Sequence, residues 1–269
     1  MVRRGIHPAH AALIGGALGV AVLSGCTPSP PAPPPPGAVF DYQLGAPYEP
    51  DVSVDVVVRD RTASPGEDMY SICYVNAFQT QPGELGDWPD ELLLRDAARD
   101  VVFDPDWPDE AFVDTSDAEA VVAVVGPWIR GCAEDGFDAV EFDNLDTYSR
   151  ARGLLERADA VVLARRLVDV AHAAGLAAAQ KNAAEDTAVL HASAHFDFAI
   201  AEECGAYREC DAYTDVYGDD VLAIEYTDNL TGVSFDEVCA DPEHPRSIIL
   251  RDRALGAPDD EGYTFRRCS

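Results

Sequence analysis

Positive charge is scarce in this sequence, and Lys181 is its only lysine. Nineteen lysines and arginines stand against 49 acidic residues, so the formal net charge is −30. A surface of this charge repels nucleic acid and anionic lipid headgroups, whereas it attracts cationic ligands. We therefore expect no nucleic-acid partner. The alternative is that the charge serves only to keep the protein soluble.

Signatures of metal and nucleotide sites are also missing. The chain has no Cys-x-x-Cys pair, which argues against a zinc site. No glycine-rich phosphate loop follows the first predicted strand, residues 40–45, which argues against a dinucleotide-binding domain. We accordingly expect neither a metal ion nor another cofactor.

The N-terminal residues resemble an export signal. Arg3 and Arg4 precede the apolar stretch 11–22, and the sequence LSGC then ends at Cys26. This order is typical of a bacterial lipoprotein signal, in which cleavage before Cys26 leaves its thiol to carry lipid. A plain signal peptide or a short membrane anchor are the alternatives, but the stretch is shorter than the roughly 20 residues that a span needs. We expect residues 1–25 to be removed.

Residues 26–37 form the next segment, which contains seven prolines. Such a run favours extended polyproline II and predicts a stalk that holds the domain above the membrane. Residues 38–269 contain no second low-complexity break and no internal repeat, so a single domain is expected. The protein is thus predicted to be a monomer at the outer face of the cell membrane, attached only through the lipid on Cys26.

Runs rich in strand-forming residues alternate with helical ones along this domain. The first clear helix is expected after a capping box formed by Ser116 and Glu119, and the second spans about 159–174 and ends at Gly175. This alternation predicts an α/β fold with a single (β/α)8 TIM barrel, and an open doubly wound sheet is the alternative. The eight expected strands are 40–45, 52–60, 70–78, 138–144, 176–182, 196–203, 221–227 and 247–252.

Six cysteines remain when Cys26 is set aside. An even number in an exported protein indicates three disulfides. The short separation of Cys204 and Cys210 favours one pair, and a link from the last barrel unit to the chain end favours Cys239 with Cys268. Cys73 is expected to face the outer helices, which makes Cys132 its partner.

Polar residues end several of the predicted strands, at the face where TIM barrels carry their active sites. A single acid at a strand end is most often a turn former, but so many polar ends together predict a site. These ends are Gln43, Asn76, Asp143–Asn144, Lys181–Asn182, Glu202–Glu203 and Glu225.

Alternation along each strand indicates which of these side chains point into the barrel. Glu141 and Asp143 share a face opposite two bulky residues, so both are expected to point inward. The same argument predicts that Glu225 points inward. Glu202 shares its parity with the bulky Phe198, so a bulge or an early end of the strand would be needed to turn it inward.

Six stretches occur in a fixed order along the chain: YQLG, ICYVNAF, GFDAVEFDNLDTY, GLAAAQKNA, FAIAEECGAYREC and VLAIEYTD. Together they resemble glycoside hydrolase family 114, the endo-α-1,4-polygalactosaminidases. The most specific parts are E-x-D-N-x-D, then K-N, then E-x-C with a second cysteine six residues on, then I-E-Y. The resemblance runs from about Phe40 to Cys268. It implies a barrel enzyme that cleaves internal α-1,4 linkages in galactosamine-rich polysaccharide.

By this resemblance the essential acids are Asp143, as nucleophile, and Glu202, as general acid/base. A glycosidase needs two such carboxylates flanking the bond, and neighbouring acids are expected to raise the pKa of one of them. The sequence departs from the family pattern at Phe142, where proline is common, and at Glu203, where glutamine is common. Because the second change places two acids side by side, the choice between Glu202 and Glu203 stays open.

Further residues are candidates for contact with the substrate, which is expected to be a cationic or partly acetylated galactosamine polysaccharide. Carboxylates would pair with its ammonium groups, and tyrosines would stack on sugars or cations. Each tyrosine is also suited to packing in the core instead of contact with a sugar. Lys181 is also suited to a salt bridge with Glu141 or Asp143. The candidates are Tyr42, Gln43, Tyr74, Asn76, Glu141, Asn144, Asp146, Tyr148, Lys181, Asn182, Glu203, Glu225 and Tyr226.

Two other classes of protein fit parts of the pattern. A sugar-binding lipoprotein could keep the barrel without the chemistry. A divalent-metal protein could use Glu141, Asp143, Asn144 and Asp146 as oxygen ligands, although their spacing lacks the glycine turn and terminal glutamate of a calcium loop. Activity on a galactosamine polymer separates the first class from an enzyme, and sensitivity to chelators identifies the second.

Overall fold

A computed structural model describes residues 1–2, 31–230 and 232–268. Cys26 and most of the predicted signal and stalk lie outside these residues. No helix within the described part of the chain is long and apolar enough to cross a membrane.

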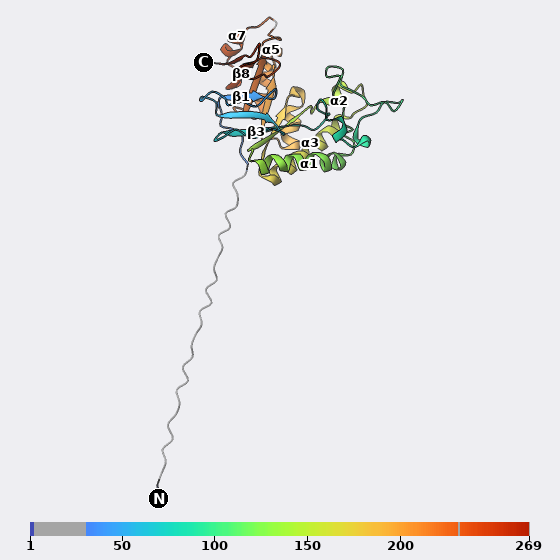
Figure 1. The fold of residues 1–269 in the computed structure, drawn as a ribbon, viewed down its shortest axis with the longest axis vertical. Coiled ribbons are helices and arrows are strands. Elements are labelled where there is room, and N and C mark those ends of the chain that lie inside the picture. Colours follow the sequence, from blue (N-terminus) through green and yellow to red (C-terminus); the bar gives the residue numbers. More distant parts are fainter. Residues whose placement is uncertain (3–30, 231, 269) are drawn as a thin grey trace.

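Eight parallel strands lie side by side in chain order and curl into a barrel-like sheet (Figure 1). All eight predicted strands are present, and the predicted (β/α)8 architecture is confirmed. The strands are β1 (Phe40–Gln43), β2 (Val56–Asp60), β3 (Tyr70–Asn76), β4 (Ala139–Asp143), β5 (Ala177–Lys181), β6 (Phe198–Glu202), β7 (Val221–Tyr226) and β8 (Ser247–Arg251).

Between β8 and β1, a side-chain hydrogen bond closes the barrel in place of a ladder of backbone hydrogen bonds. A short ninth strand, β9 (Phe265–Arg267), pairs antiparallel with the edge of β8 that would otherwise face β1. The guanidinium of the fully buried Arg251 then reaches across and donates a hydrogen bond of 2.6 Å to Asp41 of β1. This bond keeps the first and last parallel strands next to one another.

Two long helices cover one side of the sheet, α1 (Ala118–Asp135) and α3 (Arg157–Ala174), and they pack side by side (Figure 1). Short helices occupy the other connections. They are α2 (Thr147–Arg150), α4 (Thr187–Val189), α5 (Cys204–Tyr207), α6 (Cys210–Tyr217) and α7 (Phe235–Ala240), with 3-10 turns at Leu85–Asp87, Asp90–Leu92 and Ala184–Asp186 and a π-helical turn at Leu190–Ala194.

The start of α1 differs by one residue from the prediction. The N-cap is Asp117, whose carboxylate accepts from the backbone of Ala120, and the predicted cap Ser116 instead donates its own backbone N–H to Asp114. Because Ser116 is held in that preceding turn, the helix starts after it. The C-terminus of α3 is as predicted, with Gly175 in the left-handed conformation.

Large side chains fill the barrel interior on the β6 and β7 side, which corrects two predictions. Phe198 and Ile200 of β6 point inward, so Glu202 follows them into the barrel mouth without a bulge. Leu222 and Ile224 of β7 also point inward, and Glu225 therefore points outward. The physical reason is volume: β4 and β5 contribute small residues to the interior (Ala139, Ala177, Ala179), so the facing strands must supply large ones.

The connection between β3 and α1, residues 77–117, forms a lobe beside α2 (Figure 1). Isolated antiparallel bridges hold it together, including Phe103 with Ala111. A small apolar cluster of Leu94, Phe112, Ala151 and Leu155 packs the lobe against the segment between α2 and α3. The lobe therefore lies over the end of β4.

Three disulfides tie the outside of the fold together. They are Cys73–Cys132, Cys204–Cys210 and Cys239–Cys268, the three pairs expected from the sequence. Cys73 lies on the outer face of β3 and reaches Cys132 near the end of α1, as its strand parity predicts. Three bridges are consistent with an exported protein.

Candidate active site

A cleft of about 370 Å³ opens at the carboxyl ends of β3 to β7. A second hollow of about 320 Å³ adjoins it and shares Asp146, Asn182 and Glu202. The cleft is lined by Leu44, Tyr74, Gln79, Asp106, Trp107, Glu110, Asp143, Asn144, Asp146, Arg150, Lys181, Asn182, Glu202, Tyr226, Arg253 and Leu255. It thus contains both of the acids that the sequence singled out.

Lys181 lies at the floor of this cleft and is only 2% exposed. Its ammonium nitrogen is 3.1 Å from Glu141, 3.3 Å from Glu202 and 3.8 Å from Asp143. Burial would lower the pKa of Lys181, but the three carboxylates outweigh it and hold the pKa well above the usual value. A permanent positive charge therefore holds three acids together.

Asp143 is oriented by two donors. The hydroxyl of Tyr74 donates to one carboxylate oxygen at 2.8 Å, and the backbone N–H of Asn144 donates to the other at 2.8 Å. Asn144 has a left-handed backbone, and its side chain accepts from Arg150, which also bonds to Asp104 of the lobe. The turn after β4 is thereby fixed to the lobe.

Glu202 also accepts several hydrogen bonds. Asn182 donates to it at 3.0 Å, and the hydroxyl of Tyr226 donates to its other oxygen. Burial alone would raise the pKa of Glu202, but the charge of Lys181 and these two donors bring it below its usual value. We expected neighbouring acids to raise the pKa of one catalytic acid, and the opposite holds for Glu202.

The separation of the two acids suits a pair that flanks one bond. Because Lys181 Nζ lies 3.8 Å from Asp143 Oδ2 and 3.3 Å from Glu202 Oε2, these oxygens are at most about 7.1 Å apart. Glycosidase carboxyl pairs are separated by about 5–5.5 Å in retaining enzymes and about 6.5–9.5 Å in inverting enzymes. The geometry is compatible with acid catalysis on a bound sugar.

Glu141 lies beneath the cleft and is completely buried. Tyr42 donates to it at 2.6 Å, and Lys181 donates in turn to the Tyr42 hydroxyl at 2.8 Å. Burial raises the pKa of Glu141 to about 7, against the opposing effect of Lys181. Neither Glu141 nor Tyr42 lines the cleft, and both contact Lys181.

This pKa predicts how stability depends on pH. An acid with a folded pKa of about 7 and an unfolded pKa near 4.3 binds more protons in the folded state between these values. Its contribution to stability is therefore present at low pH and lost as the pH rises toward 7. We expect Glu141→Gln to stabilise the protein by about 1–3 kcal/mol at pH 8, relative to its effect at pH 5.

Thermal denaturation at pH 5 and pH 8 measures this difference. The matched control is Glu134→Gln, which removes an exposed acid from α1 and should shift the melting temperature equally at both pH values. If Glu141→Gln also shifted the melting temperature equally at pH 5 and pH 8, Glu141 would not be the group that binds a proton between these pH values.

Two of the expected contact residues point away from the cleft. Gln43 is buried on the outer face of β1, where it accepts from Arg59. Glu225 lies on the outer face of β7, where its carboxylate accepts from the backbone N–H groups of Gly205 and Ala206. The prediction that Glu225 points into the barrel is therefore wrong, and Gln43, although it ends β1 as expected, points away from the cleft.

The remaining expected residues lie at or near the two hollows. Glu203 has a left-handed backbone and pairs with Arg253, which also lies 4.0 Å from the Tyr226 ring centroid. Tyr148 lines the second hollow and donates to Asp186. Asn76 is buried behind the cleft and donates to Glu110.

Sequence reasoning missed the contribution of the lobe. Gln79, Trp107 and Glu110 line the cleft, yet they fall in a segment without strand or helix periodicity. One signal was available: Trp107 stands in the stretch DPDWPDE, where a large aromatic among acids and prolines indicates an exposed side chain in a turn. Burial of Glu110 raises its pKa to about 7.

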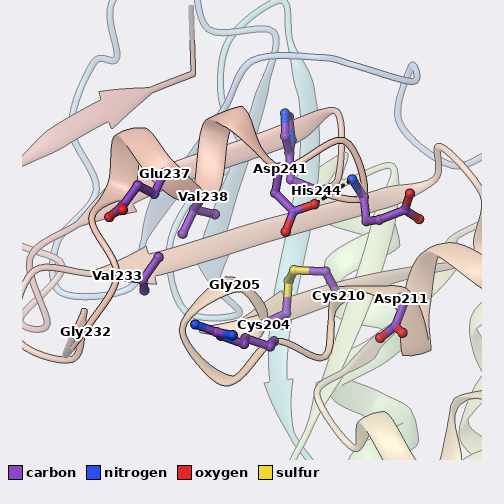
Figure 2. A pocket seen from close by; sticks show the side chains of 12 residues that line it. Cys204, Gly205, Cys210, Asp211, Gly232, Val233, Glu237, Val238, Asp241 and His244 are labelled. Carbon is purple, nitrogen blue, oxygen red and sulfur yellow. Dashed lines mark hydrogen bonds between the residues drawn. A yellow bond between two sulfur atoms is a disulfide. The ribbon is translucent and has the colours of Figure 1, made fainter.

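Another hollow, of about 660 Å³, lies outside the barrel beside the Cys204–Cys210 disulfide (Figure 2). The start of α6 flanks it on one side, and Val238 of α7 and the following turn with Asp241 and His244 flank it on the other. It contains neither of the two candidate acids. Within residues 31–230 and 232–268, no group of three acidic, histidine or cysteine side chains is arranged to hold a metal ion.

Comparisons with known proteins agree with this architecture. The model of the family described as glycoside-hydrolase family GH114 matches residues 24–269. The structure of Ega3 from Aspergillus fumigatus in complex with galactosamine is 21% identical with a TM-score of 0.69, and the match covers 85% of this chain and 96% of that chain. The glycoside hydrolase domain of PelA from Pseudomonas aeruginosa is 14% identical with a TM-score of 0.56, covering 86% and 98%. The comparison with curated proteins finds no match.

Proposed function

The chain belongs to glycoside-hydrolase family GH114, and we propose that it hydrolyses internal α-1,4 linkages in galactosamine-containing polysaccharide. The observation that carries this proposal is the pair Asp143 and Glu202, which line one cleft and contact the same ammonium group of Lys181. The bound galactosamine in the Ega3 structure and the net charge of −30 support an amino-sugar substrate.

In the proposed mechanism, Asp143 attacks the anomeric carbon while Glu202 protonates the leaving oxygen. Water then releases the sugar from Asp143, with Glu202 removing its proton. The Lys181 ammonium lies 3.8 Å from the Asp143 carboxylate, and the donors Tyr74 and Asn144 fix the orientation of that carboxylate. The side chain of Asp143 is thus oriented before the substrate arrives.

Product analysis tests this proposal on two purified α-1,4-linked polymers, one of galactosamine and one fully N-acetylated. We expect short oligosaccharides from at least one of them, with internal cleavage dominating. Binding of either polymer without any product would instead indicate a sugar-binding protein.

The low pKa of Glu202 predicts the pH dependence of activity. Glu202 must be protonated to act as the acid, and Lys181, Tyr226 and Asn182 favour its ionised form. The protonated fraction falls about tenfold for each pH unit above the pKa, so kcat/KM should fall as the pH rises above this lowered pKa. A profile of kcat/KM between pH 4 and pH 9 checks this. A kcat/KM that rises toward pH 9 would contradict the role of Glu202.

We also propose that the protein is exported and attached to the membrane through lipid on Cys26, with residues 26–37 as the stalk and 38–269 as the catalytic domain. The three disulfides support export. In a bacterial host, Cys26→Ala should abolish labelling by a radioactive fatty acid and release the protein from the membrane fraction. Unchanged labelling of Cys26→Ala would contradict this attachment.

A further inference from the structure

The lobe formed by residues 77–117 contributes a wall to the active-site cleft for which the proposed mechanism has no use. Its hairpin 104–110 closes through a backbone hydrogen bond from Asp104 to Glu110, and the Glu110 N–H donates to the Trp107 carbonyl. Thr80, just after β3, exchanges hydrogen bonds with Ala111. These bonds bring the hairpin against the end of β3, next to Asp143.

Glu110 is built into this wall as an acceptor. It is only 9% exposed, and one carboxylate oxygen accepts from both Gln79, at 2.5 Å, and Asn76, at 3.3 Å. Among the described residues, its other oxygen has no hydrogen-bond donor, and Glu110 lines the cleft. This second oxygen is open to the cleft, where a cation or a donor can reach it.

Gln79 adds a second acceptor at the same place. Its side chain is fully buried, and its amide nitrogen must face the Glu110 carboxylate, which fixes the orientation of the amide. The amide oxygen is buried and has no partner among the described residues. The two unpartnered atoms at this wall are therefore both acceptors, and the group that complements them must be a donor.

Trp107 stands at the tip of the same hairpin, and 53% of its surface is exposed although it lines the cleft. An exposed indole beside a sugar-binding cleft offers a flat apolar face to a pyranose ring and a π-system to a cation. Arg150 ties the hairpin to the turn after β4 through Asp104 and Asn144, so the indole is held on a braced loop.

We infer that Trp107, Glu110 and Gln79 form a subsite for one unsubstituted galactosamine unit of the substrate, with the indole against the sugar ring and the two acceptors at its ammonium group. An N-acetyl group has a single N–H and brings a carbonyl oxygen, which would face these acceptors unfavourably. The subsite therefore selects deacetylated units. This inference rests on the proposed function for the identity of the sugar.

The test is calorimetric binding of two matched α-1,4 oligosaccharides, one of galactosamine and one of N-acetylgalactosamine, to the full chain carrying Asp143→Asn to prevent turnover. At pH 8, above the pKa of about 7 for Glu110, adding Glu110→Gln should weaken binding of the galactosamine oligosaccharide about tenfold or more, because a charged hydrogen bond is lost. Binding of the N-acetylated one should change less than about twofold. Trp107→Ala should weaken binding of both, since the ring face is common to them.

Asp109→Asn is the matched control: it removes one charge from the same hairpin at an exposed residue that does not line the cleft, and both affinities should stay unchanged. Trp107 is exposed, so its replacement tests the subsite even if Glu110→Gln fails to fold. Equal losses for both oligosaccharides in Glu110→Gln, or no loss in either variant, would overturn the subsite. Polymer turnover by the unmodified protein tests the proposed function separately, so an inactive protein that still shows these binding differences would refute only the hydrolysis.

Discussion

Asp143→Asn and Glu202→Gln should each lower kcat on the galactosamine polymer by about a thousandfold or more, with the fold intact. Both variants keep the size of the side chain, and both remove a group that the proposed mechanism uses in the chemical step, as nucleophile in one case and as proton donor in the other. The measurements are steady-state kinetics and a melting curve for each variant.

Glu203→Gln is the matched control for these two variants. Glu203 lies next to Glu202 but turns toward Arg253, so we expect a loss of less than about tenfold. If Glu203→Gln were inactive and Glu202→Gln active, the acid/base would be the neighbouring residue. If Asp143→Asn retained normal turnover, the nucleophile assignment would be wrong.

Lys181→Gln should combine a large loss of activity with a loss of stability. Lys181 is buried and neutralises part of the charge of Glu141, Asp143 and Glu202, so its removal leaves three neighbouring carboxylates without a cation. Breaking a buried ion pair from one side costs about 3–5 kcal/mol. We expect such a loss in the free energy of unfolding at pH 8, and at least about a hundredfold loss in kcat.

The double variant Lys181→Gln with Glu141→Gln separates the two effects. Removing the buried carboxylate of Glu141 should restore much of the stability, because an unpaired buried charge disappears. Activity should not return, since Asp143 and Glu202 still lack their cation. Urea denaturation and kinetics of the four proteins in this cycle provide the comparison, and a Lys181→Gln protein as stable as the wild type at pH 8 would contradict the network.

The sequence predicted the β4 part of the site well because alternation there is unambiguous. In AVEFD the acids share one face and the bulky residues the other, so Glu141 and Asp143 could be placed inside the barrel. In VLAIEY both faces carry apolar residues, and the assumption that small residues point inward reversed the orientation of Glu225. The inward face of β7 is decided by the volume that the other strands leave unfilled in the barrel interior. The sequence of β7 alone does not contain this information.

The lobe illustrates a different limit of sequence reasoning. Gln79 and Glu110 come together because residues 79–80 pair with 111–112, a contact between irregular segments without periodicity. The contact of Lys181 with Glu141 and Asp143, in contrast, was one of two interpretations that the sequence offered for Lys181, and the three residues lie on the adjacent strands β4 and β5. The alternation along a regular strand indicates which residues of adjacent strands lie together. The neighbours of a loop residue depend on tertiary contacts that no local pattern shows.

We propose that hydrolysis takes place at the cleft that Asp143 and Glu202 share. The most direct measurement is the size distribution of products, by mass spectrometry, after the unmodified protein and the Asp143→Asn variant are incubated with the same purified α-1,4-galactosamine polymer. We expect a ladder of internal oligosaccharides from the unmodified protein and intact polymer from the variant. Intact polymer from both proteins, or the same ladder from both, would contradict it.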